Sequence, residues 1–448
     1  MIKVCIPNNY LPERKYAVTS LFRDLPASAY SFETHSEPDY SIVLPDNKKI
    51  TIKDAFFGLH AENESYISES NIPENIAYMT NEYTHEPDMP VLFGGTELKQ
   101  TNKALICEAD IFASAFFMLT RWEEAVIKDK DKHERIVEEK QLSVKHNFFF
   151  RPIVDEYVRF INNILRTYGL DIAEKPDYEL VITHDVDSLR RYDKLPKFIR
   201  ALGGDLLLRK SLKLFFGTIK DYFLIKAGKR KDPYDVFDFF MNISEKHKLK
   251  SHFYFIPGYK GEPDVRYNIN DSEVIQLIGK LKKRKHIIGL HGSYRAYNNK
   301  NYFRTELNRL KKIVGADITE GRQHFLRFSN PETWRLWEQN SLKIDSTLGF
   351  YSRVGFRAGT ANEYPVFDIL NRETLSLRES PLIAMEVALK RMQPDYKTGL
   401  QNLKALKEKI HEYGGKFILL WHNDKLNAHE WKDYSVNYEA VISTLNNN

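Results

Sequence analysis

The second half of the chain alternates strand-like apolar runs with amphipathic segments, and this alternation constrains its fold more than any other feature. The run at 180–183 comes first. Helix-like segments at 236–247, 272–283, 302–314, 331–340 and 403–413 then lead into further strand-like segments at 251–256, 287–291, 319–328, 343–347 and 417–421. Strands separated by helices pair in parallel, and their carboxyl ends meet at one edge of the sheet. We therefore predict an α/β domain with a site at the mouth of a barrel.

Residues 1–150 follow a different pattern, in which short apolar runs alternate with turn signals. The long apolar stretch at 104–121 predicts a buried helix, and the charged stretch at 123–140 predicts solvated helix or loop. The histidines of this part are scattered, and we expect them to be structural. We predict a smaller α/β accessory domain at 1–150, an amphipathic linking helix within 151–178, and the barrel at 179–446.

Bulk properties exclude several classes of protein. The sequence contains no stretch of 18 consecutive apolar residues, so we expect no membrane-spanning helix. Two cysteines, Cys5 and Cys107, cannot form a disulfide framework, and this indicates a reducing compartment. The first residues lack the apolar core of a signal peptide. We expect a cytoplasmic protein.

One segment, residues 190–231, interrupts the alternation as a basic amphipathic insertion. It carries thirteen Lys and Arg residues against three Asp residues, interleaved with apolar side chains. It could be a solvated helical hairpin, an interfacial patch for anionic lipid or a lipid-linked phosphate substrate, or a nucleic-acid contact. The whole chain has a net charge of only +5 and no recognition motif, so we expect no nucleic-acid partner.

Two acids, Asp185 and Asp187, directly follow the apolar run at 180–183. Side chains two residues apart on an extended chain point to the same face, so both are predicted to look into one site. His184, which precedes Asp185, is predicted to point to the other face and to pack against the helical layer. Metal hydrolases use such a pair as one metal ligand and one proton acceptor, although a lone pair of this kind is also typical of turns and helix caps.

Polar residues follow the other apolar runs as well. The motifs, in chain order, are THDVD at 183–187, LHGSY at 290–294, GRQHFLR at 321–327, KIDST at 343–347, GFRAG at 355–359 and LWHND at 420–424. In this order of motifs, residues 179–423 resemble the polysaccharide deacetylase family, which consists of metal-dependent amidases and esterases that remove acetyl groups from sugars. The resemblance implies a distorted (β/α)7 barrel and does not extend to residues 1–150.

The resemblance implies a role for each acid. The family's opening T-F-D-D-G appears in the looser form Thr-His-Asp-Val-Asp, so Asp185 would be the general base and Asp187 would bind a divalent ion, for which zinc is the expected metal. The family's H-[S/T]-x-x-H motif makes His291 a second ligand. The position of its second histidine is occupied by Arg295.

Arg295 leaves three outcomes open for the metal site. His324 could supply the missing nitrogen, although it could equally be a hydrogen-bonded structural residue. Asp187, His291 and water could hold the ion weakly. Alternatively, the protein could have lost both metal and chemistry and kept the pocket for binding.

The resemblance also implies an arginine that orients the base, and we favour Arg322 over Arg327 for this task. Asp345 matches a further acid whose usual partner in the family is the final histidine. That histidine is His422, which would be the general acid, because the pKa of imidazole lies near working pH. Arg357 could bind an anionic group of the substrate or pair within the barrel.

The sequence therefore predicts a metal-dependent hydrolase that removes N- or O-acetyl groups from a carbohydrate or lipid-linked sugar in surface polysaccharide metabolism. Residues 190–231 would give it peripheral contact with the inner face of the membrane. The rival prediction is a catalytically inactive glycan-binding or scaffolding protein on the same barrel.

Overall fold

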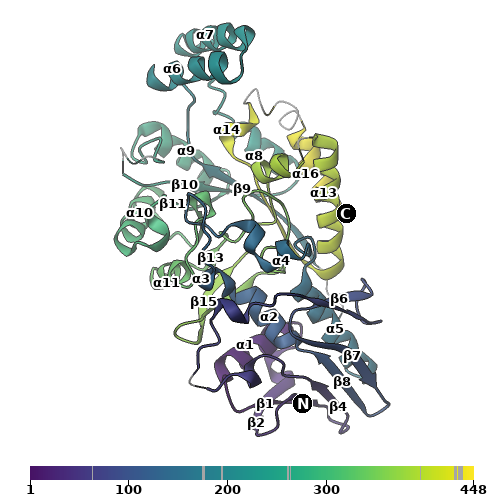
Figure 1. Ribbon diagram of the computed structural model, residues 1–448. Helices are drawn as coiled ribbons and strands as arrows, with labels where there is room; N and C mark the ends of the chain where they lie inside the picture. Colours follow the sequence, from purple (N-terminus) through teal and green to yellow (C-terminus); the bar gives the residue numbers. More distant parts are fainter. Residues whose placement is uncertain are drawn as a thin grey trace.

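The computed structural model describes residues 1–62, 64–173, 177–192, 195–259, 262, 264–393, 395–427, 431 and 437–447. Parts of the predicted linker (174–176), insertion (193–194) and barrel (428–430 and 432–436) lie outside these ranges. The chain is mixed α/β. Figure 1 shows the N-terminal sheet at the bottom, a second sheet above it, and a helical hairpin that projects at the top.

The N-terminal sheet has six strands in the order β2-β1-β3-β4-β8-β7. They are β1 (Ile2–Pro7), β2 (Tyr30–His35), β3 (Tyr40–Val43), β4 (Lys49–Ile52), β7 (Gly94–Gln100) and β8 (Ala104–Ala109); β5 (Ala77–Thr80) and β6 (Asp88–Val91) form a separate pair. Three helices pack together beside it, α1 (Leu11–Leu21), α2 (Ile111–Thr120) and α5 (Ile153–Thr167). The amphipathic segment of the predicted linker is thus α5, which also contacts α13 (Tyr396–Tyr413).

The single helix predicted at 104–121 is wrong. Residues 104–109 form strand β8, which pairs with β4 and β7, and only α2 is helical. Asp110 separates the two elements, since its carboxylate accepts a hydrogen bond of 2.9 Å from the amide of Ala113 and caps α2. An apolar run does not by itself distinguish a strand that leads directly into a helix from one long helix.

The second sheet has nine strands in the order β14-β15-β13-β12-β11-β10-β9-β17-β16. Neighbours pair in parallel except β14 and β15, which are antiparallel. The strands are β9 (Tyr178–Val186), β10 (Ser251–Phe255), β11 (Ile287–Gly292), β12 (Glu320–Gln323), β13 (Ile344–Asp345), β14 (Tyr364–Asp368), β15 (Glu373–Glu379), β16 (Ala384–Met385) and β17 (Gly415–Leu420). The parallel pairing agrees with the predicted alternation.

Helices alternate with these strands, as the sequence predicts. They are α8 (Phe237–Lys246), α9 (Ser272–Lys283), α10 (Lys300–Val314), α11 (Glu332–Gln339), α12 (Glu386–Met392) and α13, followed by α14 (Asn423–Leu426) and α16 (Tyr438–Asn446). The strand predicted at 319–328 is shorter than expected. It ends at Gln323 because the chain turns into the 3-10 helix η7 (His324–Leu326), in which Phe325 has a φ of 62°.

The charged stretch at 123–140 is less solvated than predicted. It begins with the short helix α3 (Glu123–Val126), and a second short helix, α4 (Leu142–Lys145), follows it. Glu124 is buried and accepts hydrogen bonds from Arg121 at 3.0 Å and from Arg357 at 2.6 Å. Arg357 therefore pairs inside the protein, and its ion pair joins residues 1–150 to the second sheet.

The predicted insertion is a hairpin of α6 (Leu195–Gly203), the π-helical turn η5 (Gly204–Leu208) and α7 (Leu212–Lys226), which packs mainly on itself. It stands apart from the body of the molecule (Figure 1). Among the described residues, no helix combines the length and the apolar character that crossing a membrane requires.

Candidate active site

The carboxyl ends of the central parallel strands bring six of the seven residues singled out in the sequence to one place. Asp185 and Asp187 lie at the end of β9, and His291 lies at the end of β11. Arg322 and His324 come from the end of β12, and His422 is the second residue after β17. All of these except the more deeply buried Arg322 line a cavity of about 300 Å³.

Asp187, His291 and His324 form a compact cluster of metal-type ligands. Their nearest ligand atoms all lie within 4.8 Å of one another. The Nε2 atom of His291 is 3.4 Å from one carboxylate oxygen of Asp187, and the Nε2 atom of His324 is 3.5 Å from the other. His324 therefore lies in the cluster, whereas the side chain of Arg295 is exposed and contacts Tyr302.

Contacts at the Nδ1 atoms fix the orientation of both imidazoles, His291 and His324. The Nδ1 atom of His291 donates to the main-chain carbonyl of Arg322 at 2.9 Å, and the Nδ1 atom of His324 lies 2.9 Å from a carboxylate oxygen of Asp264. These contacts leave each Nε2 atom facing Asp187. Histidine ligands of metal ions are typically held in this way.

The donor set fits a divalent metal ion. The Oδ1 atom of Asp187 and the Nε2 atom of His291 are buried, and neither has a hydrogen-bond partner in the described part of the chain. Buried polar atoms seldom lack partners in folded proteins, so the two atoms indicate a site for a cation. Two imidazoles and one carboxylate are a common ligand set for catalytic zinc, with a further position open to water or substrate.

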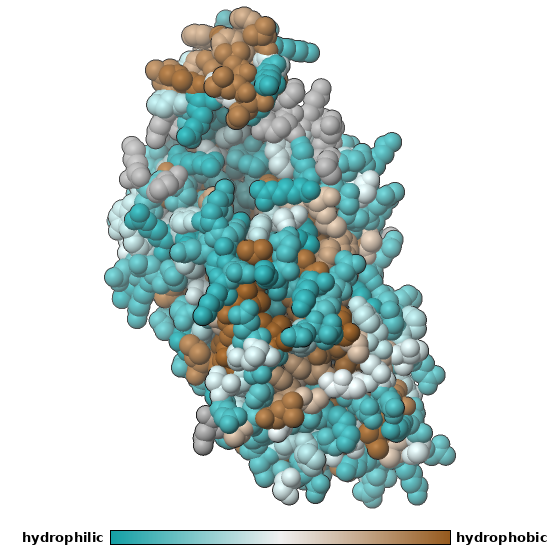
Figure 2. Space-filling view, in the orientation of Figure 1, coloured by the Kyte–Doolittle hydropathy of each residue, from teal (hydrophilic) through white to brown (hydrophobic). Residues whose placement is uncertain are grey.

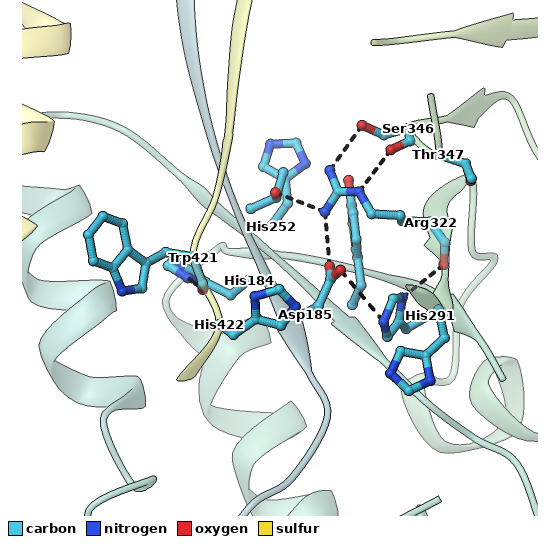
Figure 3. Close-up of polar contacts among 12 residues, drawn as sticks. His184, Asp185, His252, His291, Arg322, Ser346, Thr347, Trp421 and His422 are labelled. Carbon is cyan, nitrogen blue, oxygen red and sulfur yellow. Dashed lines mark hydrogen bonds and ion pairs between the residues drawn. The ribbon is translucent and has the colours of Figure 1, made fainter. Parts of the chain in front are cut away.

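Asp185 is held as an ionised carboxylate beside this cluster. Its Oδ1 atom accepts a hydrogen bond of 2.9 Å from Arg322, and its Oδ2 atom lies 3.5 Å from the Nε2 atom of His291 (Figure 3). Burial opposes its ionisation, but the charges of His291 and Arg322 outweigh burial and lower its pKa. The guanidinium is fixed in turn by the hydroxyl of Thr183 at 3.0 Å and the carbonyl of Ser346 at 2.8 Å.

Of the two arginines considered, Arg322 contacts the predicted base. Arg327 instead donates to the carbonyls of Tyr294 and His133, and it packs between the rings of Tyr294 and Tyr297.

His422 lies beside the cluster. Its Nε2 atom is 4.0 Å from Asp187, and its Nδ1 atom is 2.7 Å from the buried carboxylate of Glu386. Burial alone would lower the pKa of His422, but its interactions with Glu386 and with the two aspartates raise it to about 10. The imidazole is thus kept protonated at neutral pH.

The expected pairing of Asp345 with the final histidine is wrong. Asp345 is buried at the end of β13, where its carboxylate accepts hydrogen bonds from the amide and hydroxyl of Thr347. Burial raises its pKa to about 7. Glu386, at the start of α12, takes the position beside His422 instead. No motif marked Glu386 in the sequence, because it follows the two-residue strand β16 in a stretch without a clear periodic pattern.

His184 packs as predicted. Its ring stacks on Phe240 with centroids 3.9 Å apart, and its Nδ1 atom is 2.8 Å from the carbonyl of Trp421. Figure 3 shows it directed away from Asp185, on the other side of the strand.

Residues 1–150 also contribute to the pocket, which the sequence did not indicate. His133 and Arg135 line it. Arg135 donates to the carbonyl of Phe325 at 2.9 Å and lies over the ring of Tyr351. No sequence signal marks these residues, because they reach the pocket only through packing against the loop after β12.

Comparisons with known proteins give a partial match. Residues 2–169 match the model of a family of unknown function, DUF7033. No curated protein matches the chain. Among solved structures, similarity is found to a protein assigned as a polysaccharide deacetylase from Mycobacterium smegmatis, with 13% identity, a TM-score of 0.38, and coverage of 62% of this chain and 86% of that one. A CE4 family pseudoenzyme from Bacillus anthracis shows 9% identity and a TM-score of 0.29 over 63% of this chain and 74% of that one, and a mutant of it with restored enzymatic activity has the same identity and TM-score. At identities and TM-scores this low, we infer function from the geometry of the site alone.

Proposed function

We propose that this chain is a metal-dependent hydrolase that removes acetyl groups from a carbohydrate. The observation that carries the proposal is the convergence of Asp187, His291 and His324 on one point, flanked by the ionised Asp185 and the protonated His422. A divalent ion held by the three ligands, which we propose to be zinc, would polarise the acetyl carbonyl and lower the pKa of a water molecule.

The residues of the chain have separable tasks in this scheme. Asp185 accepts the proton of the attacking water, and Arg322 keeps it ionised and aimed into the pocket. His422, charged through its pairing with Glu386, lies beside the cluster and donates a proton to the leaving sugar nitrogen or oxygen. Base and acid thus both border the proposed metal site.

The lining of the pocket supports a sugar that carries a negative charge. Apart from Asp185 and Asp187, its described residues include one acid, Asp424, which pairs with Arg266 at 3.9 Å and with Lys425 at 2.8 Å. The basic side chains of the lining are Arg135, Arg266, Arg391 and Lys425. A lipid-linked sugar, whose linkage contains phosphate, would complement this charge, and we propose that such a substrate is processed in the cytoplasm. We further propose that the second sheet corresponds to the distorted (β/α)7 barrel of polysaccharide deacetylases, with residues 1–150 as an accessory domain.

The proposal is tested by measuring bound metal and acetate release on the purified chain. We expect about one divalent ion per chain, as zinc, together with release of acetate from acetylated oligosaccharides. His324→Ala is the most informative variant, because the proposal makes His324 the ligand that replaces the histidine missing at Arg295. It is expected to lose the metal and to lower activity by more than about 100-fold, as loss of a metal ligand or its orientation does.

Arg295→Ala is the matched control, since this exposed side chain lies close in sequence to His291 but outside the cluster. It should retain both metal and activity. A wild-type chain that binds no divalent ion, and whose glycan affinity is unchanged by Asp185→Asn, would instead identify a binding protein on an inactive barrel.

A further inference from the structure

The hairpin of α6, η5 and α7 exposes large apolar side chains that soluble surfaces seldom gather in one place. At the tip, in η5, Leu207 and Leu208 are 77% and 85% exposed. On the helices, the exposed apolar side chains are Leu195, Ile199, Leu212, Phe216 and Phe223. Figure 2 shows a hydrophobic cap over α6 and α7 at the top of the molecule.

Helical geometry aligns part of this cap into a stripe. At about 100° per residue, Leu212, Phe216 and Phe223 lie within about 40° of one another on α7. Lys213 and Lys220 lie about 60–80° to one side of the stripe, at its flank. An apolar stripe with lysines at its edge is the arrangement of helices that lie in a membrane interface.

The hairpin is strongly basic. Residues 195–231 contain ten Lys and Arg residues and two Asp residues, Asp205 and Asp221. Both acids are neutralised within the hairpin, by Arg209 at 2.7 Å and by Arg230 respectively. Lys213 and Lys220 form no ion pair with any described residue, so the surplus charge faces outward and complements an anionic surface.

The apolar residues are exposed although the hairpin has a packed interior of its own. The hydroxyl of Thr218 on α7 donates to the buried Asp205 at 2.7 Å. Phe198 on α6 stacks on Tyr222 on α7 with ring centroids 4.0 Å apart. These contacts hold the helices together with the leucine tip and the stripe directed outward, so their exposure is built into the fold.

The base of the hairpin adjoins the candidate active site. Asp187 at the end of β9 is followed at once by residues 188–192, which lead into the hairpin. The returning chain is tied to the outgoing one, because the carboxylate of Asp232 accepts a hydrogen bond of 2.9 Å from the amide of Arg191. Asn423, next to His422, donates to the carbonyls of Ser188 and Tyr234 at this base.

We propose that this hairpin docks the protein on a bilayer that contains anionic phospholipid. Leu207, Leu208 and the stripe of α7 enter the interface, and the surrounding lysines contact lipid phosphates. The docked hairpin holds the active site at the membrane surface, where the sugar of a lipid-linked substrate lies. This last step rests on the proposed hydrolase function, whereas the docking does not.

The test measures cosedimentation of the full chain with two kinds of vesicle, phosphatidylcholine alone and phosphatidylcholine mixed with phosphatidylglycerol. We expect binding to the anionic vesicles, weakened by added salt and at least tenfold weaker to neutral ones. Lys213→Ala with Lys220→Ala should weaken binding about 30-fold, because each lysine near the surface contributes roughly fivefold. Leu207→Glu with Leu208→Glu should abolish it.

Leu370→Glu is the matched control, because Leu370 is 58% exposed outside the hairpin. It should bind like the wild type. Equal binding to neutral and anionic vesicles, or unchanged binding in the hairpin variants, would overturn the proposal. So would a wild type that does not bind vesicles but forms a dimer in sedimentation velocity that the leucine variant abolishes, since the cap would then cover a second copy. Metal content and acetate release from a soluble oligosaccharide report separately on the proposed function and should not change in these variants.

Discussion

At the scale of single residues, charge distribution separates the two proton-transfer groups of the site. Asp185 and His422 both border Asp187, yet each has a partner of its own. Arg322 donates to the carboxylate of Asp185, and Glu386 pairs with the imidazole of His422. Arg322 lowers the pKa of Asp185, and Glu386 raises that of His422. One group is therefore poised to accept a proton and the other to donate one.

Glu386→Gln should shift the pH dependence of the reaction. Because Glu386 raises the pKa of His422 in the folded protein, its loss lowers that pKa. The protonated imidazole is the donor and exists below its pKa, so the alkaline limb of kcat/KM should move to lower pH. Titration of the His422 ring by NMR gives a second measurement that does not depend on turnover.

Glu320→Gln is the control for this experiment. Glu320 forms a similar pair with His252, at 2.5 Å, at the start of β12 and away from the pocket. The control should leave the alkaline limb in place. An unchanged titration of His422 in Glu386→Gln would refute the role of Glu386 in raising its pKa.

At the scale of elements, the hairpin and the sheet are physically separable. The main packing partners of α6 and α7 are each other and η5, and the two chain segments at the hairpin's base meet at Asp232 and Arg191. The sheet, by contrast, is formed from strands whose neighbours lie far apart in the chain, such as β9 between β10 and β17. Function can therefore be divided between the two.

Replacing residues 193–231 with a short Gly-Ser linker should leave the core folded. Few contacts with the body are lost, so the unfolding midpoint should change by no more than about 2 °C, as for surface changes in general. The measurement is thermal unfolding by circular dichroism, with metal content as a second readout. A drop of more than about 10 °C would show that the hairpin is part of the core.

At the scale of the whole molecule, buried ion pairs join residues 1–150 to the second sheet. Glu124 on α3 pairs with Arg357, which follows β13 in the chain, and both side chains are almost fully buried. Arg353, which is partly exposed, pairs with the buried Glu138 at 3.0 Å. His133 and Arg135 also line the pocket. These contacts indicate that residues 1–150 and the second sheet fold and function as one unit.

Arg357→Met tests this coupling. Without Arg357, the buried Glu124 shares Arg121 with the buried Glu123. One buried negative charge then lacks compensation, so we expect a loss of about 3 kcal/mol in the free energy of unfolding. Denaturant titration should still show one cooperative transition, at a lower midpoint. Lys3→Met, which breaks an exposed pair with Glu33, should leave the midpoint unchanged. Two separate transitions in the wild type would contradict the coupling.

Much of the architecture could be predicted because helical and strand periodicity are local properties of the chain. The alternation of parallel strands and helices, the pair Asp185 and Asp187, and the place of His422 at a strand end all followed from the sequence alone. The boundary between β8 and α2 did not, because an apolar run carries no sign of where its backbone changes from strand to helix.

The partners of these residues were decided only by the tertiary structure. His324 faces Asp187 because β12 lies beside β11 and the chain turns sharply after Gln323. Glu386 reaches His422 because β16 pairs with β17 at the sheet edge. Each such contact depends on which strands become neighbours and on how the loops after them turn, and these are set by the packing of the whole chain. The sequence alone determined the acids at the end of β9 and the class of chemistry that they suit, whereas packing decided which side chains complete the site around them.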